Sequence, residues 1–120
     1  MLGGGMRQVG VIAAAGIVAL TTMVERLVED HANARLLAEG LAGLPGVQVD
    51  PAAVATNIVI FRVGDAEQAG LLVEAVKREG VLIWPFGANR IRAVTHEGIT
   101  ADDCQKAIDA VRRAMAAVAA

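Results

Sequence analysis

The sequence predicts an α+β domain in two layers, with helices packed on a small, mainly antiparallel sheet and a long helical region at the amino terminus. The predicted elements follow the order helix, helix, strand, strand, helix, strand, strand, helix, which is typical of this class. The last two strands, residues 81–84 and 90–96, are separated by a short turn and can therefore pair antiparallel. A chain of 120 residues has room for one such domain.

The amino-terminal region is predicted as two helices, from about residue 6 to 22 and from 24 to 42. Residues 9–24 carry no charge, but these 16 positions fall short of the roughly 20 that a bilayer core requires, which disfavours a membrane span. The run continues directly into an amphipathic helix, which disfavours a secretory signal. We expect the first helix to be apolar all round and buried, and the second to bury one face.

Two strands are predicted after the turn GLPG at residues 43–46. Residues 47–49 form a short strand that Pro51 ends, and residues 56–63, TNIVIFRV, form a longer one rich in β-branched residues. Because the longer strand is apolar on both alternating faces, we expect it to be central in the sheet and covered on both sides, with part of that cover supplied from outside this small chain.

The second half of the chain continues with an amphipathic helix over residues 65–80. It has an acidic first turn and basic residues in its last turn, as the helix dipole favours. The final helix is predicted to begin at Thr100, which forms a capping-box pattern with Asp103.

Composition restricts the classes of partner. The chain has 11 basic and 13 acidic residues and a formal net charge of −2, which excludes a strong field for nucleic acid or an anionic membrane. Cys104 is the single cysteine, so one chain can form neither a disulfide framework nor a thiolate metal site, and a cytoplasmic location is expected. Hydrophobic residues make up 55%, which predicts that part of the surface meets another domain or subunit.

Arg90 and Arg92 are the main candidates for ligand binding. They are two positions apart in an apolar strand, so their side chains, with Val94 and His96, project from one face while Ile91 and Ala93 take the other. The arginine fork matches a carboxylate or phosphate, which makes this strand a candidate anion site. The alternative is an edge strand with solvated arginines.

The opening stretch MLGGGMRQVG is a second candidate. Glycines ahead of a helix allow close backbone approach to a ligand, and the helix start favours an anion beside Arg7. The run matches no complete phosphate-loop pattern, and a flexible terminus is the alternative.

The remaining candidates receive structural interpretations. His31 is predicted to be a packed residue on an apolar helix face, and Cys104 a bystander whose thiol the helix start could acidify. His96 has no second ligand at metal spacing, so no metal site is predicted. Trp84 and Phe86 are expected to cap the core, with a stacking wall as the alternative.

Five segments taken in order resemble the carboxy-terminal third of the low-specificity L-threonine aldolases, which are pyridoxal-phosphate enzymes of the aspartate-aminotransferase fold superfamily. The segments are MLGGGMRQVGV, VERLVEDHANARLLAEGL, LPGVQVDP, TNIVIF and RIRAVTH. The resemblance implies a single domain over residues 1–120, with connecting helices over 1–43 and an α/β sandwich over 44–120. It also implies a lyase that cleaves β-hydroxy-α-amino acids to glycine and an aldehyde, with pyridoxal 5′-phosphate as cofactor.

The resemblance assigns roles to two arginines. Arg92 would bind the α-carboxylate of the amino-acid substrate, and Arg7 would lie near the phosphate of the cofactor. The family's Schiff-base lysine precedes the GGGMRQ motif, and neither Lys77 nor Lys106 corresponds to it. The chain departs from the family where VTH continues as EGITADD.

We therefore expect a carboxy-terminal domain or fragment of such a lyase, with no catalytic residue of its own and no activity alone. Its expected partners are a large cofactor domain or other subunits, in a homo-oligomer. The alternative is a non-catalytic module that binds a small carboxylate or another subunit.

Overall fold

Three short strands form an antiparallel sheet with the order β1-β3-β2. The small, mainly antiparallel sheet was predicted, but this order was not. The computed structural model describes residues 5–118. Strand β1 spans Ile58–Arg62, β2 spans Trp84–Pro85 and β3 spans Arg90–Val94. The central strand is therefore β3, which carries the two candidate arginines, and not β1.

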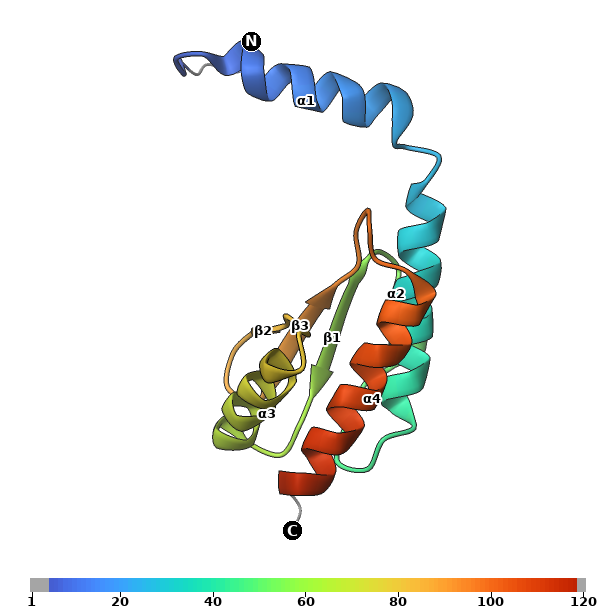
Figure 1. Cartoon of the computed structure of the whole chain (residues 1–120), viewed down its shortest axis with the longest axis vertical. Helices are drawn as coiled ribbons and strands as arrows, with labels where there is room; N and C mark the ends of the chain where they lie inside the picture. The colour runs from blue at the N-terminus through green and yellow to red at the C-terminus, as the bar shows by residue number, and fades with distance from the viewer. Residues whose placement is uncertain (1–4, 119–120) are drawn as a thin grey trace.

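Three helices lie on one side of this sheet and complete the two layers (Figure 1). They are α2 (Leu27–Ala42), α3 (Ala66–Arg78) and α4 (Ala101–Val118). Together they bury the inward side chains of the strands, Val59, Phe61, Ile91 and Ala93. The α+β prediction is confirmed.

The opposite face of the sheet is open. Ile58 and Ile60 of β1 alternate with the buried residues and are each about two-fifths exposed. The described chain covers only one face of this strand, because all three packed helices lie on that side, in agreement with the expectation that this chain does not supply both covers. An apolar row thus remains exposed on the sheet face that the helices do not cover.

Several predicted boundaries shift. Residues 47–49 do not form a strand; only Gln48 bridges to Arg62, through backbone hydrogen bonds of 2.9 and 2.8 Å. Most of the predicted strand at 81–84 is extended chain, and pairing with β3 begins at Trp84. Pro51 begins the short 3₁₀ helix η1 (Pro51–Ala53), which the side chain of Asp50 caps at Ala52.

The capping box at the start of α4 is confirmed. The Thr100 hydroxyl accepts from the Asp103 backbone N–H at 3.2 Å, and the Asp103 carboxylate accepts from the Thr100 N–H at 3.1 Å. This reciprocal pair satisfies two backbone donors that the helix leaves free.

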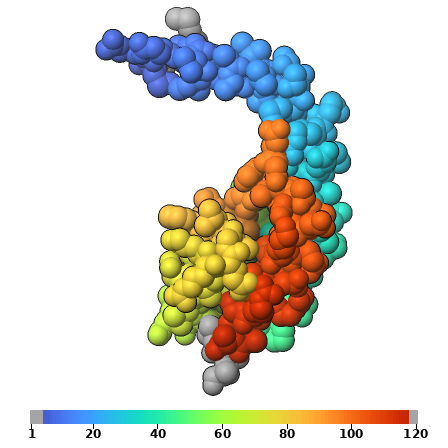
Figure 2. Space-filling model, in the orientation of Figure 1, coloured from blue at the N-terminus to red at the C-terminus, as the bar shows by residue number. Residues whose placement is uncertain are grey.

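Helix α1 (Val9–Thr22) extends away from the sheet and its helices like an arm (Figures 1 and 2). A break at residues 23–26 bends it by 83° from α2. The expected burial is wrong for the described chain, since no residue of α1 is buried and Val11 and Leu20 are about three-quarters exposed. Within residues 5–118 no single helix could cross a membrane by length and composition, and only the bent pair α1 and α2 meets those criteria together.

Candidate carboxylate-binding face

The candidate site lies on the open face of the sheet, where three arginines gather. The strand register places Arg92 opposite Ile60 and Arg90 opposite Arg62. Arg90 and Arg92 are half-buried and share a face with Val94, as predicted, while Ile91 and Ala93 point into the core. The period-two alternation of an extended strand is sufficient to explain this arrangement.

Arg92 has donor capacity to spare. Its Nε is buried and has no hydrogen-bond partner among the described residues. Within residues 5–118 it forms no ion pair with an acidic side chain. A buried N–H of a cation without an acceptor is unfavourable by about 1–3 kcal/mol.

A cavity of about 540 Å³ adjoins Arg92. It is bounded by Val73, Glu74, Lys77, Leu82, Ile83, Trp84, Pro85, Arg92, Val94 and His96. The wall is largely apolar, with Arg92 on the sheet side and both Glu74 and Lys77 on the helix side, so an anion entering it would meet positive charge from Arg92 and charges of both signs from α3. The alternative of an edge strand is wrong because β3 is the central strand, although Arg90 and Arg92 both remain partly exposed.

Phe86 lies against both candidate arginines. The guanidinium carbons of Arg90 and Arg92 are 5.0 and 5.6 Å from the centroid of its ring. The expectation that Trp84 and Phe86 cap the core is wrong, since both are exposed on the open face. The contact of Phe86 with the arginines was not predicted, although an aromatic residue in the turn just before an arginine strand is a signal for it.

Hydrogen bonds fix both ends of β3. At one end the Asn89 amide donates to the Val63 carbonyl at 2.9 Å, and at the other the Asn57 amide donates to the Thr95 carbonyl at 2.7 Å. An asparagine side chain thus links each end of β3 to the chain that flanks the neighbouring strand β1.

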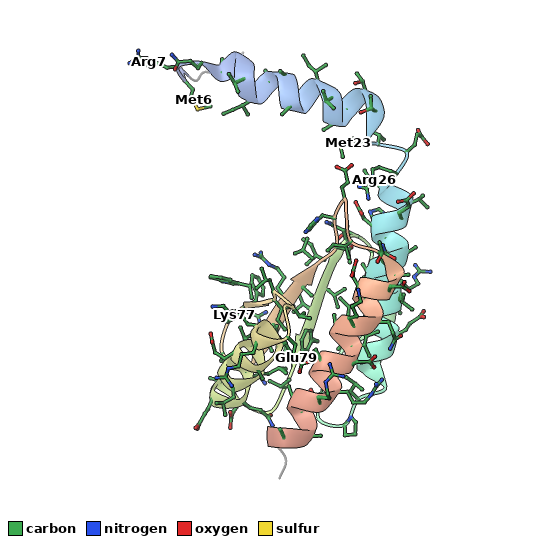
Figure 3. The ribbon with its side chains drawn as sticks, in the orientation of Figure 1. Met6, Arg7, Met23, Arg26, Lys77 and Glu79 are labelled. Atoms are coloured by element: carbon green, nitrogen blue, oxygen red, sulfur yellow. The ribbon has the colours of Figure 1, made fainter. Side chains whose placement is uncertain are left out.

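Arg7 is not brought near this face. It lies just before α1, at the end of the arm remote from the sheet (Figure 3). Glycines 3 and 4 of the opening stretch lie outside the described residues. The structure therefore does not join the two anion candidates of the sequence into one site.

Three further candidates are placed as follows. His31 is exposed, not packed as predicted, because it lies on the outer side of α2. His96 is exposed, and its Nδ1 lies 2.7 Å from the Glu97 carbonyl oxygen.

The thiol of Cys104 is not acidified by the helix start. Burial, and to a lesser degree the charge of Asp103, raise the pKa of this thiol. Residues 5–118 contain no cluster of three metal-ligating side chains.

Residues 1–64 match the family model described as Beta-eliminating lyase. The chain belongs to this family. Two curated relatives extend the similarity over most of its length. The low-specificity L-threonine aldolase 1 of Arabidopsis thaliana is 40% identical over 116 residues, which are 95% of this chain and 32% of that protein. The low specificity L-threonine aldolase of Escherichia coli K12 is 47% identical over 98 residues, which are 80% of this chain and 27% of that protein.

Solved structures with the same fold are also found for this member of the Beta-eliminating lyase family. A serine palmitoyltransferase from S. paucimobilis, solved with a bound pyridoxal-phosphate adduct, aligns with a TM-score of 0.73 at 24% identity over 89% of this chain and 28% of that one. The Escherichia coli cysteine desulfurase CsdA aligns with a TM-score of 0.73 at 18% identity. The alignment covers 97% of this chain and 33% of the desulfurase. The chain thus spans about a third of the length of the proteins it matches.

The lysines of this family member lie on exposed helical positions. The Lys106 ammonium pairs with the Asp103 carboxylate at 2.9 Å, and Lys77 lies in the last turn of α3.

Proposed function

We propose that the chain forms the carboxy-terminal domain of a threonine-aldolase-like lyase, which cleaves L-threonine and L-allo-threonine to glycine and an aldehyde. The observation that carries the proposal is the buried, unpaired Nε of Arg92 beside the 540 Å³ cavity. The names of the two curated relatives support the reaction. A cytoplasmic location is part of the proposal.

Arg92 binds the α-carboxylate of the substrate in this proposal. Its planar guanidinium can donate two parallel hydrogen bonds to the two carboxylate oxygens. The strand holds the guanidinium at a defined height above the sheet, and the apolar cavity wall weakens competition by water. Arg92 thereby orients the amino acid without taking part in bond cleavage.

The described residues do not build a site for pyridoxal phosphate by themselves. Arg7 is exposed on the arm, and Lys77 and Lys106 are exposed on helices remote from it. We propose that the cofactor, an electron sink for amino-acid chemistry, is held by the part of the enzyme that this chain does not span. Arg7 would then contribute positive charge near its phosphate.

The partner surfaces are α1 and the open sheet face. Both expose rows of apolar side chains, among them Val11, Leu20, Ile58 and Ile60. We propose that the larger cofactor domain covers them and that the complete enzyme is a homo-oligomer.

A chimeric enzyme tests this function. The matching segment of the Escherichia coli aldolase is replaced by this chain, and release of glycine and acetaldehyde from L-threonine is measured. The chimera should be active, and Arg92→Lys should raise KM by about 10- to 100-fold, the factor for a charged hydrogen-bonded pair. Arg35→Lys, at an exposed arginine of α2 outside the Arg92 cavity, serves as control. An unchanged KM in Arg92→Lys would refute the role of Arg92.

A free-standing carboxylate-binding module is the second candidate, favoured because Arg62, Arg90 and Arg92 form no ion pair with an acidic side chain among the described residues. Calorimetry of the chain alone with glycine, L-threonine and phosphate addresses it. Binding that disappears in Arg92→Ala would support this candidate, and no heat with any of the three would discard it.

A further inference from the structure

The Arg92 guanidinium is held in place by an aromatic ring and not by an acid. Within residues 5–118 it forms no ion pair with a carboxylate, and its Cζ lies 5.6 Å from the centroid of the Phe86 ring. Cation–π attraction operates at this range.

The kind of contact matters for ligand binding. A carboxylate that held Arg92 would occupy its N–H donors and cancel its charge. A ring acts on the guanidinium through the π face and leaves the N–H groups available. The unpaired Nε of Arg92 agrees with this arrangement.

Phe86 is itself fixed to the strand that carries the arginines. Its backbone N–H donates to the Arg90 carbonyl at 2.8 Å, and Trp84, two residues earlier, pairs with Arg92. The turn continues through Gly87 at φ +95°, where a Cβ would lie 3.0 Å from Nη2 of Arg90. The backbone of Phe86 is therefore held next to the strand that carries the two guanidinium groups.

We propose that Phe86 is a positioning residue, which orients Arg92 so that its free N–H donors receive the carboxylate of an amino acid. This inference rests on the carboxylate role proposed for Arg92. Arg90, 5.0 Å from the same ring centroid, keeps a second positive charge beside the site and adds to its attraction for an anion.

The test uses ¹H–¹⁵N spectra of the arginine Nε–Hε groups in the full 120-residue chain. The Arg92 signal is assigned by its loss in Arg92→Lys. In Phe86→Leu, which keeps an apolar side chain but no ring, this signal should lose its ring-current shift. Phe86→Tyr should retain this shift.

The second measurement is a titration with sodium acetate and with glycine, compared with sodium chloride at equal ionic strength. The affinity for both carboxylates should fall about two- to fivefold in Phe86→Leu and should be restored in Phe86→Tyr.

The controls separate this inference from the proposed function. Leu71→Ala shortens an exposed apolar residue of α3 outside the Arg92 cavity and should leave the signal and the affinity unchanged. Amide spectra confirm that each variant is folded. If Phe86→Leu and the parent chain share the same signal and affinity, the role of Phe86 is refuted while that of Arg92 stands. If Arg92→Lys binds acetate as tightly as the parent, the role of Arg92 is refuted, and the inference with it.

Discussion

The Thr95 hydroxyl donates a hydrogen bond of 2.6 Å to the backbone carbonyl of Asp30. The Asp30 carboxylate in turn accepts two hydrogen bonds from the Arg26 guanidinium, at 2.7 and 2.9 Å, and only 3% of Asp30 is exposed. Arg26 lies at the bend between α1 and α2 (Figure 3). Asp30 thus connects the end of the arginine strand, through its backbone carbonyl, with the bend at the base of α1, through its carboxylate.

Removal of the Thr95 hydroxyl should destabilise the domain. Thr95→Val keeps the shape of a buried side chain but loses the donor to Asp30, so the free energy of unfolding in urea should fall by about 1 kcal/mol. The matched control is Thr22→Val, whose exposed hydroxyl bonds only to Val18 of its own helix; it should change stability by less than about 0.5 kcal/mol. Equal losses of unfolding free energy in both variants would show that the Thr95–Asp30 hydrogen bond stabilises the domain no more than an exposed hydroxyl does.

Two helix glycines should respond to alanine with opposite signs. A Cβ at Gly40 of α2 would lie 2.3 Å from Cδ1 of the buried Ile108, so Gly40→Ala should destabilise by about 1–3 kcal/mol through overpacking. At Gly70 of α3 no heavy atom lies within 4 Å of the added Cβ, and Gly70→Ala should stabilise by about 0.5–1 kcal/mol. Urea unfolding of both variants measures this, and a stabilised Gly40→Ala would contradict the close packing of α2 on α4.

The capping box should be visible in the titration of Asp103. Hydrogen bonds from the Thr100 hydroxyl, from Lys106 and from the Thr100 backbone lower the pKa of Asp103 from its ordinary 3.8 to about 2. Because the folded pKa is depressed, this contribution to stability is complete above about pH 4 and is lost as the pH falls toward 2. Thr100→Ala should raise the pKa of Asp103 more than Lys106→Gln does, as measured by carboxyl NMR. An ordinary pKa in the parent chain would contradict the box.

Cys104 should be unreactive in the folded chain. It is buried, and burial followed by the charge of Asp103 raises the pKa of its thiol, so little thiolate is accessible at neutral pH. Modification with a chromogenic disulfide reagent should be slow in buffer and fast in urea. Rapid native reaction would show that the start of α4 opens readily.

The sequence predicted the elements whose signal is local. The amphipathic spacing of residues 65–80 and the Thr100–Asp103 pattern describe contacts within a few residues, and both were found. The placement of Arg90 and Arg92 on one face followed from strand alternation alone. Residues 47–49 failed as a strand because a strand also needs a partner along its length, and the fold supplies only the single bridge from Gln48 to Arg62.

Other features depended on residues distant in the sequence or on cover outside the described chain. No local pattern distinguishes an apolar helix that is buried from one that is exposed, so the position of α1 was not foreseen. The Thr95–Asp30 bond joins residues 65 positions apart. The sequence by itself determined which side chains share a face, because backbone periodicity sets the direction of each side chain. Only the tertiary structure decided what each face meets, such as the Phe86 ring beside Arg92, because those contacts arise from the packing of separate elements.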